Sequence, residues 1–336
     1  MILTKPWLWV PSRMAHDLSP YFLQLYAGLK ARRTPTWKSF TWQGLEFKNP
    51  LGVAGGVDKD GEQIQAWWNL GAGFIEVGTV TPQAQPGNSG QTMSRNLARQ
   101  ALWNRMGFPS RGAQHMEKNL APLSEPHLTP IFVNIGKNAR TPLETAQDDY
   151  LYCLRKLSPY ADALVINISS PNTAGLRELL KPQYLHSFLQ PLAEANRNEF
   201  ARPLILKLSP DMSDEELETA LEVSLEVGFE GWIFTNTSTG LREGLAFPKE
   251  GGVSGGPLAL CAKNKLKKAL EVLGPRRRGK LLISCGGVLS PEDAFERLEL
   301  GADLVQVYSA LVFCGPSFFQ QVAKQAALKP PEVLTP

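Results

Sequence analysis

Cysteine and histidine are scarce in this sequence of 336 residues, which contains only four of each. The cysteines are Cys153, Cys261, Cys285 and Cys314. They include no CxxC pair, so neither a zinc ribbon nor a local redox motif can form. Four cysteines in a chain of this length do not make a disulfide scaffold, and we expect reduced thiols in a cytosolic protein. The histidines are isolated and no HExxH motif occurs, which argues against a histidine-based metal site.

Long apolar runs are also missing. No stretch of 18 apolar residues occurs, so no transmembrane helix is predicted, and the apolar segment at residues 6–11 is too short and too proline-rich for a signal peptide. Hydrophobic residues make up 43% of the chain and charged residues 20%, which excludes a mostly disordered protein. The net charge of +3 says little about partners, but the first 50 residues hold seven lysines and arginines against two acidic residues. Positive charge is therefore concentrated at the N-terminus.

The N-terminal segment carries an apolar pattern of its own. Residues 12–30 predict two short helices, the first capped by Ser12 and the second by Ser19, with Pro20 in its first turn. The spacing leaves two interpretations open. The pair could dock on the main domain, which spacing alone favours, or it could form a peripheral membrane anchor with cationic flanks. The apolar stripe consists of Phe22, Leu25, Tyr26 and Leu29, and the cations after it are Lys30, Arg32 and Arg33.

Eight short apolar runs follow, each rich in Val, Ile or Leu with little alternation, as in strands buried on both faces. They span residues 49–54, 74–80, 131–135, 163–168, 204–208, 232–237, 281–284 and 304–308. Amphipathic stretches at residues 60–70, 146–157, 213–227, 262–272 and 291–300 predict helices. The sequence thus predicts an α/β fold, a (β/α)8 TIM barrel with a short N-terminal helical extension. We expect a hairpin at residues 42–47 to floor the barrel and residues 81–130 to add strands over its opposite face.

The carboxyl ends of the strands, where barrel enzymes carry their chemistry, hold amides, hydroxyls, glycines and two lysines. They lack the carboxylate pair of a glycosidase and the ligands of a catalytic metal. Asparagine offers both a donor and an acceptor, which suits a flat heterocycle with imide groups. Glycines after the seventh and eighth strands suit phosphate capture by backbone N–H groups. Any one of these residues could belong to an ordinary barrel rim, so the signal lies in their joint occurrence.

Several sequence words resemble those of a known family. They are NPLGVAGGVDKDGE at residues 49–62, GFIEVGTVTPQAQPGN at 73–88, NRMGF at 104–108, VNIGKN at 133–138, VINISSPNTAGLR at 165–177, LKLSPD at 206–211, TNTS at 235–238, GGVSGGPL at 251–258 and CGGVLSPEDA at 285–294. Together they resemble class 2 dihydroorotate dehydrogenase, the quinone-linked, membrane-associated flavoenzyme family of pyrimidine biosynthesis. The resemblance covers residues 12–325, and the NISSPNT word is its most specific part.

The resemblance implies two sets of binding residues. FMN contacts fall on Ala54, Gly55, Lys59, Gly78, Thr79, Asn134, Asn167, Lys207, Thr235, Ser254, Gly255, Gly286, Gly287, Tyr308 and Ser309. Substrate contacts fall on Lys59, Asn104, Arg105, Met106, Gly107, Phe108, Asn167, Asn172, Asn236 and Thr237. Within the first set, the resemblance places Lys207 beside the flavin pyrimidine edge, where it would stabilise charge that develops on reduction.

The resemblance also implies the catalytic base and the quinone contacts. The base is Ser170, which would take a proton from C5 of dihydroorotate while a hydride leaves C6. A free serine is a poor base, and the sequence leaves open whether a water or Thr173 relays its proton. Quinone oxygens would meet His16 and Arg95. Two of these residues also have an ordinary interpretation: His16 could be a plain surface histidine, and Ser170 could only cap the next structural element.

The implied function is oxidation of dihydroorotate to orotate, with FMN as hydride acceptor and ubiquinone or menaquinone as final electron acceptor, in the biosynthesis of UMP. The family also implies a monomer, peripherally attached to the cytoplasmic face of the inner cell membrane, with no nucleic-acid partner. We expect a quinone-tunnel segment at residues 1–40, an FMN-binding barrel at 41–330 and a tail at 331–336.

Some residues depart from the family pattern. Ala98-Arg99-Gln100 replaces a usual Pro-Glu-Asp, Gly55-Gly56 replaces a common Ala-Gly, and Trp103 replaces a smaller aliphatic residue. These changes bear on the shape of the tunnel more than on the chemistry.

Three alternatives stay open. A class 1 enzyme with a soluble acceptor is disfavoured by serine at 170, where class 1 relatives have cysteine. A flavin-dependent dihydrouridine synthase would need a basic face for RNA, for which Arg276, Arg277 and Arg278 with the nearby lysines are the candidate. An inactive, membrane-bound interaction barrel is disfavoured by the intact Lys59, Asn104, Ser170 and Lys207.

Overall fold

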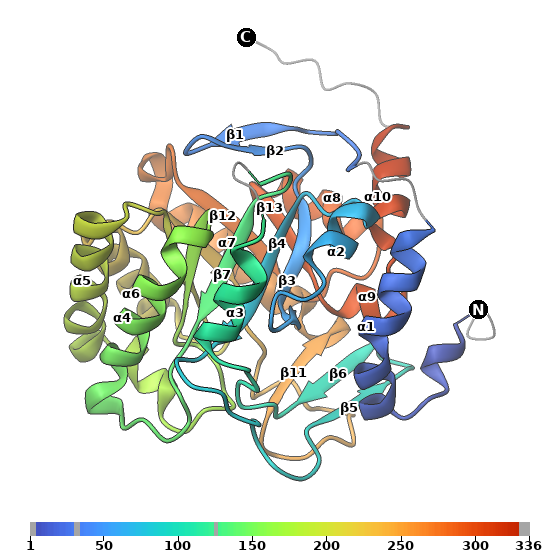
Figure 1. The fold of residues 1–336 in the computed structure, drawn as a ribbon, viewed down its shortest axis with the longest axis horizontal. Helices are drawn as coiled ribbons and strands as arrows, with labels where there is room; N and C mark the ends of the chain where they lie inside the picture. Colours follow the sequence, from blue (N-terminus) through green and yellow to red (C-terminus); the bar gives the residue numbers. More distant parts are fainter. Residues whose placement is uncertain (1–4, 30–33, 124–126, 329–336) are drawn as a thin grey trace.

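A closed barrel of eight parallel strands forms the centre of the molecule (Figure 1). The computed structural model describes residues 5–29, 34–123 and 127–328. Around the barrel the strands follow the order β10-β12-β13-β3-β4-β7-β8-β9. They are β3 (Leu51–Asp58), β4 (Phe74–Val80), β7 (Ile131–Ile135), β8 (Ala163–Asn167), β9 (Leu204–Lys207), β10 (Gly231–Phe234), β12 (Leu281–Cys285) and β13 (Leu304–Val307). All eight predicted strands are confirmed, and the TIM barrel with them.

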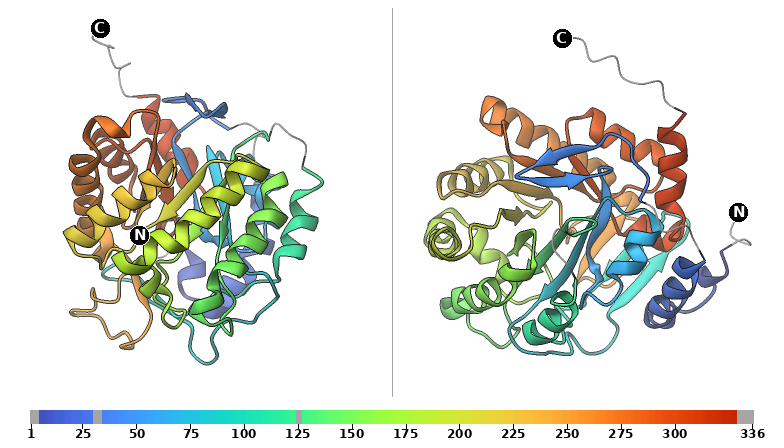
Figure 2. Two further views of the ribbon diagram at one scale, coloured as in Figure 1. Left: turned by 90° about the vertical axis from the view of Figure 1, so that its left-hand side faces the viewer. Right: turned by 45° about the horizontal axis from the view of Figure 1, so that its top comes forward.

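Helices cover the outside of the barrel (Figure 2). They are α2 (Ile64–Leu70), α3 (Ala113–Leu120), α4 (Ala146–Leu157), α5 (Pro182–Glu199), α6 (Asp214–Glu226), α7 (Ala259–Leu273), α8 (Pro291–Glu299), α9 (Ser309–Phe313) and α10 (Phe318–Ala326). The prediction for α4 agrees with its observed bounds, whereas α2 begins four residues later than expected. The reason is Asp58, whose buried carboxylate accepts the backbone N–H groups of Glu62 and Gln63 and holds residues 59–63 in a turn.

Both ends of the barrel are covered, as predicted. The hairpin of β1 (Phe40–Trp42) and β2 (Leu45–Phe47) closes one end, where the ring of Phe47 packs edge-on against Phe74 and Phe132 at centroid distances of 6.1 and 6.2 Å. Over the opposite end lies an antiparallel sheet of β5 (Met93–Asn96), β6 (Ala101–Asn104) and β11 (Gly252–Gly255). Figure 1 shows the two covers at opposite ends. Only the end under β5, β6 and β11 coincides with the carboxyl ends of the strands.

After a short 3-10 helix at Pro6–Leu8, the N-terminal segment forms a single α-helix, α1 (Ser12–Gly28), where the sequence predicts two. Pro20 lies inside it and has no N–H to donate to the carbonyl of His16, four residues earlier. The hydroxyl of Ser19 donates to that carbonyl instead, at 2.8 Å, so the helix continues through the proline. Pro11 occupies the N-cap position and no side chain caps the helix. The predicted capping roles of Ser12 and Ser19 are therefore wrong.

Helix α1 lies on the flank of the barrel beside α2 and β5 (Figure 1). Leu23 and Ala27 are buried in this contact. The predicted apolar stripe is divided: Phe22, Leu25 and Leu29 are 65%, 67% and 79% exposed, whereas Tyr26 is half-buried against the core. Docking therefore uses one face of α1 and leaves a second apolar face free. The cations Lys30, Arg32 and Arg33 lie outside the described residues, as does the tail at 331–336.

Trp103, one of the departures from the family pattern, is buried in the sheet of β5, β6 and β11 over the carboxyl ends of the barrel strands. Its indole N–H donates to the carbonyl of Glu250 at 2.6 Å. The larger side chain thus ties β6 to the long loop that follows β10.

Candidate active site

One cavity of about 840 Å³ opens at the carboxyl ends of the barrel strands and extends to α1. Nearly all the residues singled out from the sequence line it. Those that line it are His16, Ala54, Gly55, Lys59, Thr79, Arg95, Asn104, Met106, Gly107, Phe108, Asn134, Asn167, Ser170, Asn172, Lys207, Thr235, Asn236, Thr237, Ser254, Gly286, Gly287, Tyr308 and Ser309. Side chains from all eight strand ends thus meet in one space, which also reaches the N-terminal helix.

Three residues of the same sets do not line this cavity. Gly78 packs against the backbone of Asn134, and Gly255 packs against that of Gln100. Neither site has room for a side chain. Arg105 turns outward, where its guanidinium contacts the carbonyl of Ser89 at 3.0 Å and the carboxylate of Glu250 at 3.4 Å. These positions shape or border the cavity rather than face it.

A buried carboxylate that sequence analysis missed organises the floor of the cavity. Glu76 lies in the middle of β4, is fully buried, and forms an ion pair with Lys207 at 2.9 Å. It also accepts hydrogen bonds from the amides of Asn134 and Gln306, the latter at 2.6 Å. Burial by itself would lower the pKa of Lys207, but the adjacent Glu76 carboxylate raises it above its usual value. The lysine is therefore held as a cation. The signal available in the sequence was a single glutamate inside an otherwise apolar strand.

Asparagine amides form a second cluster above this floor. The amide N–H₂ of Asn167 donates to Thr79 Oγ1 at 3.0 Å and to Asn134 Oδ1 at 3.2 Å, and its Oδ1 accepts from Asn236 at 3.2 Å. Asn172 donates to Asn104 Oδ1 at 2.8 Å. Several polar atoms at this site are buried and have no partner within the described part of the chain, namely Asn172 Oδ1, Thr237 Oγ1 and Gln306 Oε1. Because buried polar groups are normally paired, these atoms mark places where a polar ligand fits.

Ser170 lies on the loop after β8 and is almost fully buried. Its hydroxyl oxygen accepts the backbone N–H of Asn172 at 3.2 Å. Among the described residues no histidine or carboxylate contacts this hydroxyl, and nearby Thr173 has a buried hydroxyl without a partner. The loop is held from behind by Arg177, which donates to the carbonyls of Ser169 and Thr237, both at 3.0 Å. An ion pair to Asp211 at 2.8 Å fixes Arg177 in turn.

Lys59 connects the barrel site to α1. Its ammonium nitrogen lies 3.1 Å from His16 Nε2. Burial lowers the pKa of Lys59 to about 8. Burial, with the charge of Lys59 as the next cause, lowers the pKa of His16 to about 4. His16 is therefore a neutral ring at physiological pH and faces the cavity, so it is not an ordinary surface histidine.

The side chain of Arg95, the other residue expected to bind quinone, forms hydrogen bonds to backbone carbonyls. Its guanidinium donates to the carbonyls of Trp7, Leu8 and Val10, with 2.7 Å to Leu8. These residues precede α1, so Arg95 anchors the N-terminal segment at the edge of the cavity. Arg95 therefore both lines the cavity and anchors the N-terminal segment through its Nη2 atom.

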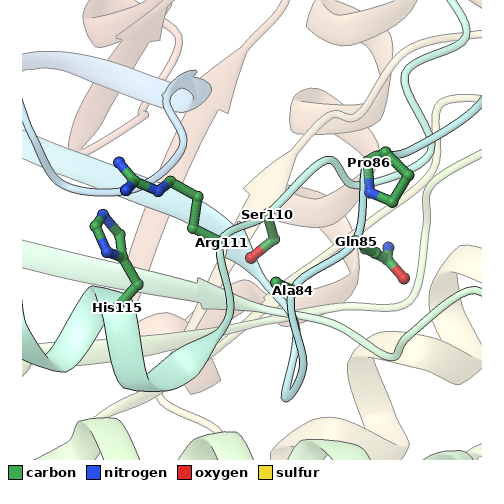
Figure 3. Close-up of a pocket in the computed structure, with 6 residues that line it drawn as sticks. All are labelled: Ala84, Gln85, Pro86, Ser110, Arg111 and His115. Carbon is green, nitrogen blue, oxygen red and sulfur yellow. The ribbon is translucent and has the colours of Figure 1, made fainter.

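A second, more open hollow lies outside the barrel mouth (Figure 3). It is lined by Ala84, Gln85, Pro86, Ser110, Arg111 and His115. The cation and the imidazole in this hollow are both in contact with Glu62, at 2.5 Å for Arg111 and 3.1 Å for His115. The Arg111 cation is thus paired already, and the hollow contains none of the site residues that the sequence singled out. The chemistry of this chain belongs to the larger cavity.

The comparisons with known proteins agree with this geometry. The family model described as dihydroorotate dehydrogenase matches residues 39–328. Proteins named dihydroorotate dehydrogenase (quinone) are similar over most of their length. One from Thermus thermophilus is 44% identical over 279 residues, which are 82% of this chain and 78% of the relative. One from Chloroflexus aurantiacus is 43% identical over 285 residues, 81% and 77% of the two chains.

Solved structures show the same likeness. The crystal structure of DHODH from Eimeria tenella in complex with ferulenol superposes with a TM-score of 0.85 at 31% identity, covering 94% of this chain and 90% of the other. The ligand-free type from the same organism gives a TM-score of 0.81 at 32% identity, with 93% and 92% covered. A matched family model over most of the chain, extensive sequence identity and a shared fold lead to one conclusion: the chain belongs to the dihydroorotate dehydrogenase family.

Proposed function

We propose that this chain oxidises dihydroorotate to orotate in pyrimidine biosynthesis, with FMN as its bound cofactor and a membrane quinone, ubiquinone or menaquinone, as final electron acceptor. The single observation that carries the proposal is the continuity of the cavity. It joins the serine, lysines and amides at the strand ends to apolar side chains of α1, both buried and exposed. A polar substrate and an apolar acceptor can thus both approach one redox centre.

The residues of the cavity fit FMN. Gly286 and Gly287 have φ angles of +118° and +72°; a Cβ on Gly286 would overlap the side chain of Leu258, and one on Gly287 would overlap the backbone of Ala259 at the start of α7. Such a glycine loop lets backbone approach a phosphate closely. The unpartnered Gln306 Oε1 and Thr237 Oγ1 support a polar, heterocyclic occupant. The residues that would hold FMN are Ala54, Gly55, Lys59, Thr79, Asn134, Asn167, Lys207, Thr235, Ser254, Gly286, Gly287, Tyr308 and Ser309, with Gly78 and Gly255 shaping the walls. When bound, FMN supplies a two-electron acceptor for the hydride and a donor for the quinone.

The side chains above the floor serve the substrate. Asn104, Asn167, Asn172 and Asn236 offer amide donors and acceptors that match the imide edge of a pyrimidine, and Lys59 offers a cation for its carboxylate. Ser170 takes the proton from C5 as the hydride leaves C6, so that the substrate loses two hydrogens and gains a C5–C6 double bond. Lys207, kept cationic by Glu76, stabilises negative charge that develops at the floor.

The free apolar face of α1 supports peripheral attachment to a membrane. In a bacterial cell this would be the cytoplasmic face of the inner membrane. We propose that the enzyme acts there as a monomer. Among the described residues no helix is long and apolar enough to cross a membrane. Trp9, Tyr21, Phe22 and Leu25 are all at least 60% exposed, and aromatic and aliphatic side chains of this kind insert into the headgroup region. Quinone would enter beside this face and pass His16.

The acceptor provides the direct test of this function. We expect the purified protein to be yellow, and dihydroorotate to bleach the flavin absorbance under anaerobic conditions. With quinone analogues, fumarate and NAD assayed in parallel, only quinones should support turnover. Turnover with fumarate or NAD but not with quinone would assign the chain to the class 1 type instead.

Variants of the exposed face of α1 test the membrane proposal. A fully buried large apolar side chain contributes about 1.5–3 kcal/mol. The double variant Phe22→Ser with Leu25→Ser should therefore bind anionic lipid vesicles at least about tenfold more weakly and show a raised KM for a long-tailed quinone. Turnover with a small soluble dye should not change. Leu260→Ser is the matched control, since Leu260 is 65% exposed on α7, away from α1. Equal vesicle binding by the double variant and the control would refute the proposed attachment.

The alternative of a dihydrouridine synthase receives no support from the charged surface. Several of the cations proposed as an RNA-binding face lie beside acids: Arg277 pairs with Asp303 at 3.3 Å, Lys265 with Asp214 at 3.0 Å, and Arg276 with Glu222 at 3.9 Å. Paired charges present little field to a phosphate backbone.

A further inference from the structure

Arg297 is a fully buried arginine that the reaction described above does not use. It lies on α8 and is only 1% exposed. Its Nη1 donates to Ser284 Oγ at 3.1 Å, and its Nη2 donates to the carbonyls of Ala259 and Gly286 at 2.9 and 3.0 Å. The third nitrogen, Nε, has no partner. Arg297 therefore fastens the glycine loop after β12 to the start of α7, two of the segments around the active cavity.

Burial lowers the pKa of Arg297, and the charges of Glu296 and Asp293 on α8 offset only part of this effect. Among the described residues none forms an ion pair with its guanidinium. The two acids closest to it on α8 are engaged elsewhere: Glu296 pairs with Lys263 at 2.8 Å, and the carboxylate of Asp293 accepts the N–H groups of Leu289 and Ser290. Burying a charge without a counter-ion is unfavourable. An anion that binds near the guanidinium would supply the missing charge.

The glycine loop on which Arg297 acts lines the cavity. The other candidates for the phosphate are Gly255, Gly287, Tyr308 and Ser309, and none of these carries a charge. Of the two lysines of the cavity, Lys207 is paired with Glu76, and Lys59 lies beside the neutral ring of His16, where its charge is assigned to the carboxylate of the substrate. A phosphate carries a charge of about −1.5 to −2 near neutral pH. Arg297 is thus the cation directly bonded to the loop that would receive it.

The hydrogen bond from Arg297 to the carbonyl of Gly286 also fixes the orientation of the Gly286–Gly287 peptide. In a trans peptide the carbonyl of Gly286 and the N–H of Gly287 point to opposite sides of the chain. Since Arg297 holds the carbonyl, the N–H of Gly287 is turned away from the guanidinium, and Gly287 lines the cavity. A carbonyl that accepts a charge-assisted bond polarises its peptide and makes the N–H a stronger donor.

We propose that Arg297 is the counter-charge for the phosphate of FMN, acting through the Gly286–Gly287 peptide and without touching the phosphate. This inference rests on the proposed FMN-dependent function. Arg297 is a positioning residue, and its role is selective: it strengthens binding of a flavin that carries a phosphate and leaves binding of the isoalloxazine ring unaffected.

The experiment compares FMN with riboflavin, which lacks the phosphate. The full-length chain is stripped of flavin and titrated with each, and quenching of flavin fluorescence gives the two dissociation constants. The wild type should prefer FMN. Arg297→Gln should reduce that preference by about ten- to hundredfold, the range expected for a buried cation and a dianion at an intermediate dielectric constant. Arg276→Gln is the matched control, because it removes one positive charge from an exposed site and should leave the preference unchanged.

Arg297→Lys guards against misfolding, since it keeps the charge. It should retain most of the preference for FMN. If Arg297→Gln keeps the wild-type preference, or if Arg297→Lys weakens FMN and riboflavin equally, Arg297 is a structural tie only and the inference is wrong. A wild-type chain that binds neither flavin would instead refute the proposed function, so the two failures are distinguishable.

Discussion

Replacing Ser170 with alanine should slow reduction of the flavin by dihydroorotate by about 10²–10⁴-fold, the usual contribution of a general base. Flavin content should stay at the wild-type level, because the cofactor would be held by other strand ends. The hydroxyl accepts only the N–H of Asn172 within the loop, so its loss removes little from the fold. Stopped-flow absorbance under anaerobic conditions measures the reduction step alone, without the contribution of the quinone.

Ser169→Ala provides the matched control for this variant. Ser169 neighbours Ser170, is equally buried, and its hydroxyl contacts the amides of Asn167 and Asn236. It should affect substrate binding more than the rate of proton removal. Normal reduction by Ser170→Ala, or an equal loss in both variants, would contradict the assignment of Ser170 as the base.

The second large effect concerns the ion pair on the cavity floor. Glu76→Gln preserves the shape of the side chain but leaves Lys207 buried without its partner. Breaking one side of a buried pair costs about 3–5 kcal/mol, so the midpoint of urea unfolding should fall clearly. Retention of FMN should fall as well, because an unpaired lysine loses its fixed position.

The loss of stability in Glu76→Gln should depend on pH in a defined direction. In the wild type the folded-state pKa of Lys207 is raised, so its contribution to stability is present below the usual lysine pKa and is lost as pH rises through the higher folded value. In Glu76→Gln burial dominates and the folded pKa falls below the unfolded one. The destabilisation of the variant is then largest at low pH and decreases as pH approaches about 10.4, the usual lysine value.

A double variant separates the pair from other effects. Glu76→Gln combined with Lys207→Met removes both charges, and exchange of a buried pair for neutral groups is often close to neutral in stability. The double variant should therefore be more stable than Glu76→Gln alone. Equal losses in the two, with no pH dependence in the single variant, would show that Glu76 stabilises the barrel through Asn134 and Gln306 and not through Lys207.

Much of the barrel follows from local composition. Strands buried on both faces must be apolar at successive positions, and this makes each one recognisable without knowledge of its neighbours. β4 and β7 have the bounds that their apolar runs predict. Because parallel strands all end on one side, residues such as Asn134, Asn167 and Lys207 could be grouped into one site before their distances were known. The structure brings them together in the cavity.

Other features depend on contacts between residues distant in sequence. The sequence shows Glu76 only as a lone glutamate in an apolar strand, and closure of the barrel brings it to Lys207, 131 residues later. The continuity of α1 through Pro20 depended on one hydroxyl reaching one carbonyl, a geometry that helix periodicity does not contain. Which face of α1 would dock was likewise decided by the surface of α2 and β5, which buries Leu23 and leaves Phe22 exposed. The sequence by itself determined the strands and the chemical character of their ends, since both depend on whether each side chain is apolar or polar. The partners of the buried charges were decided only when tertiary packing removed water from around them.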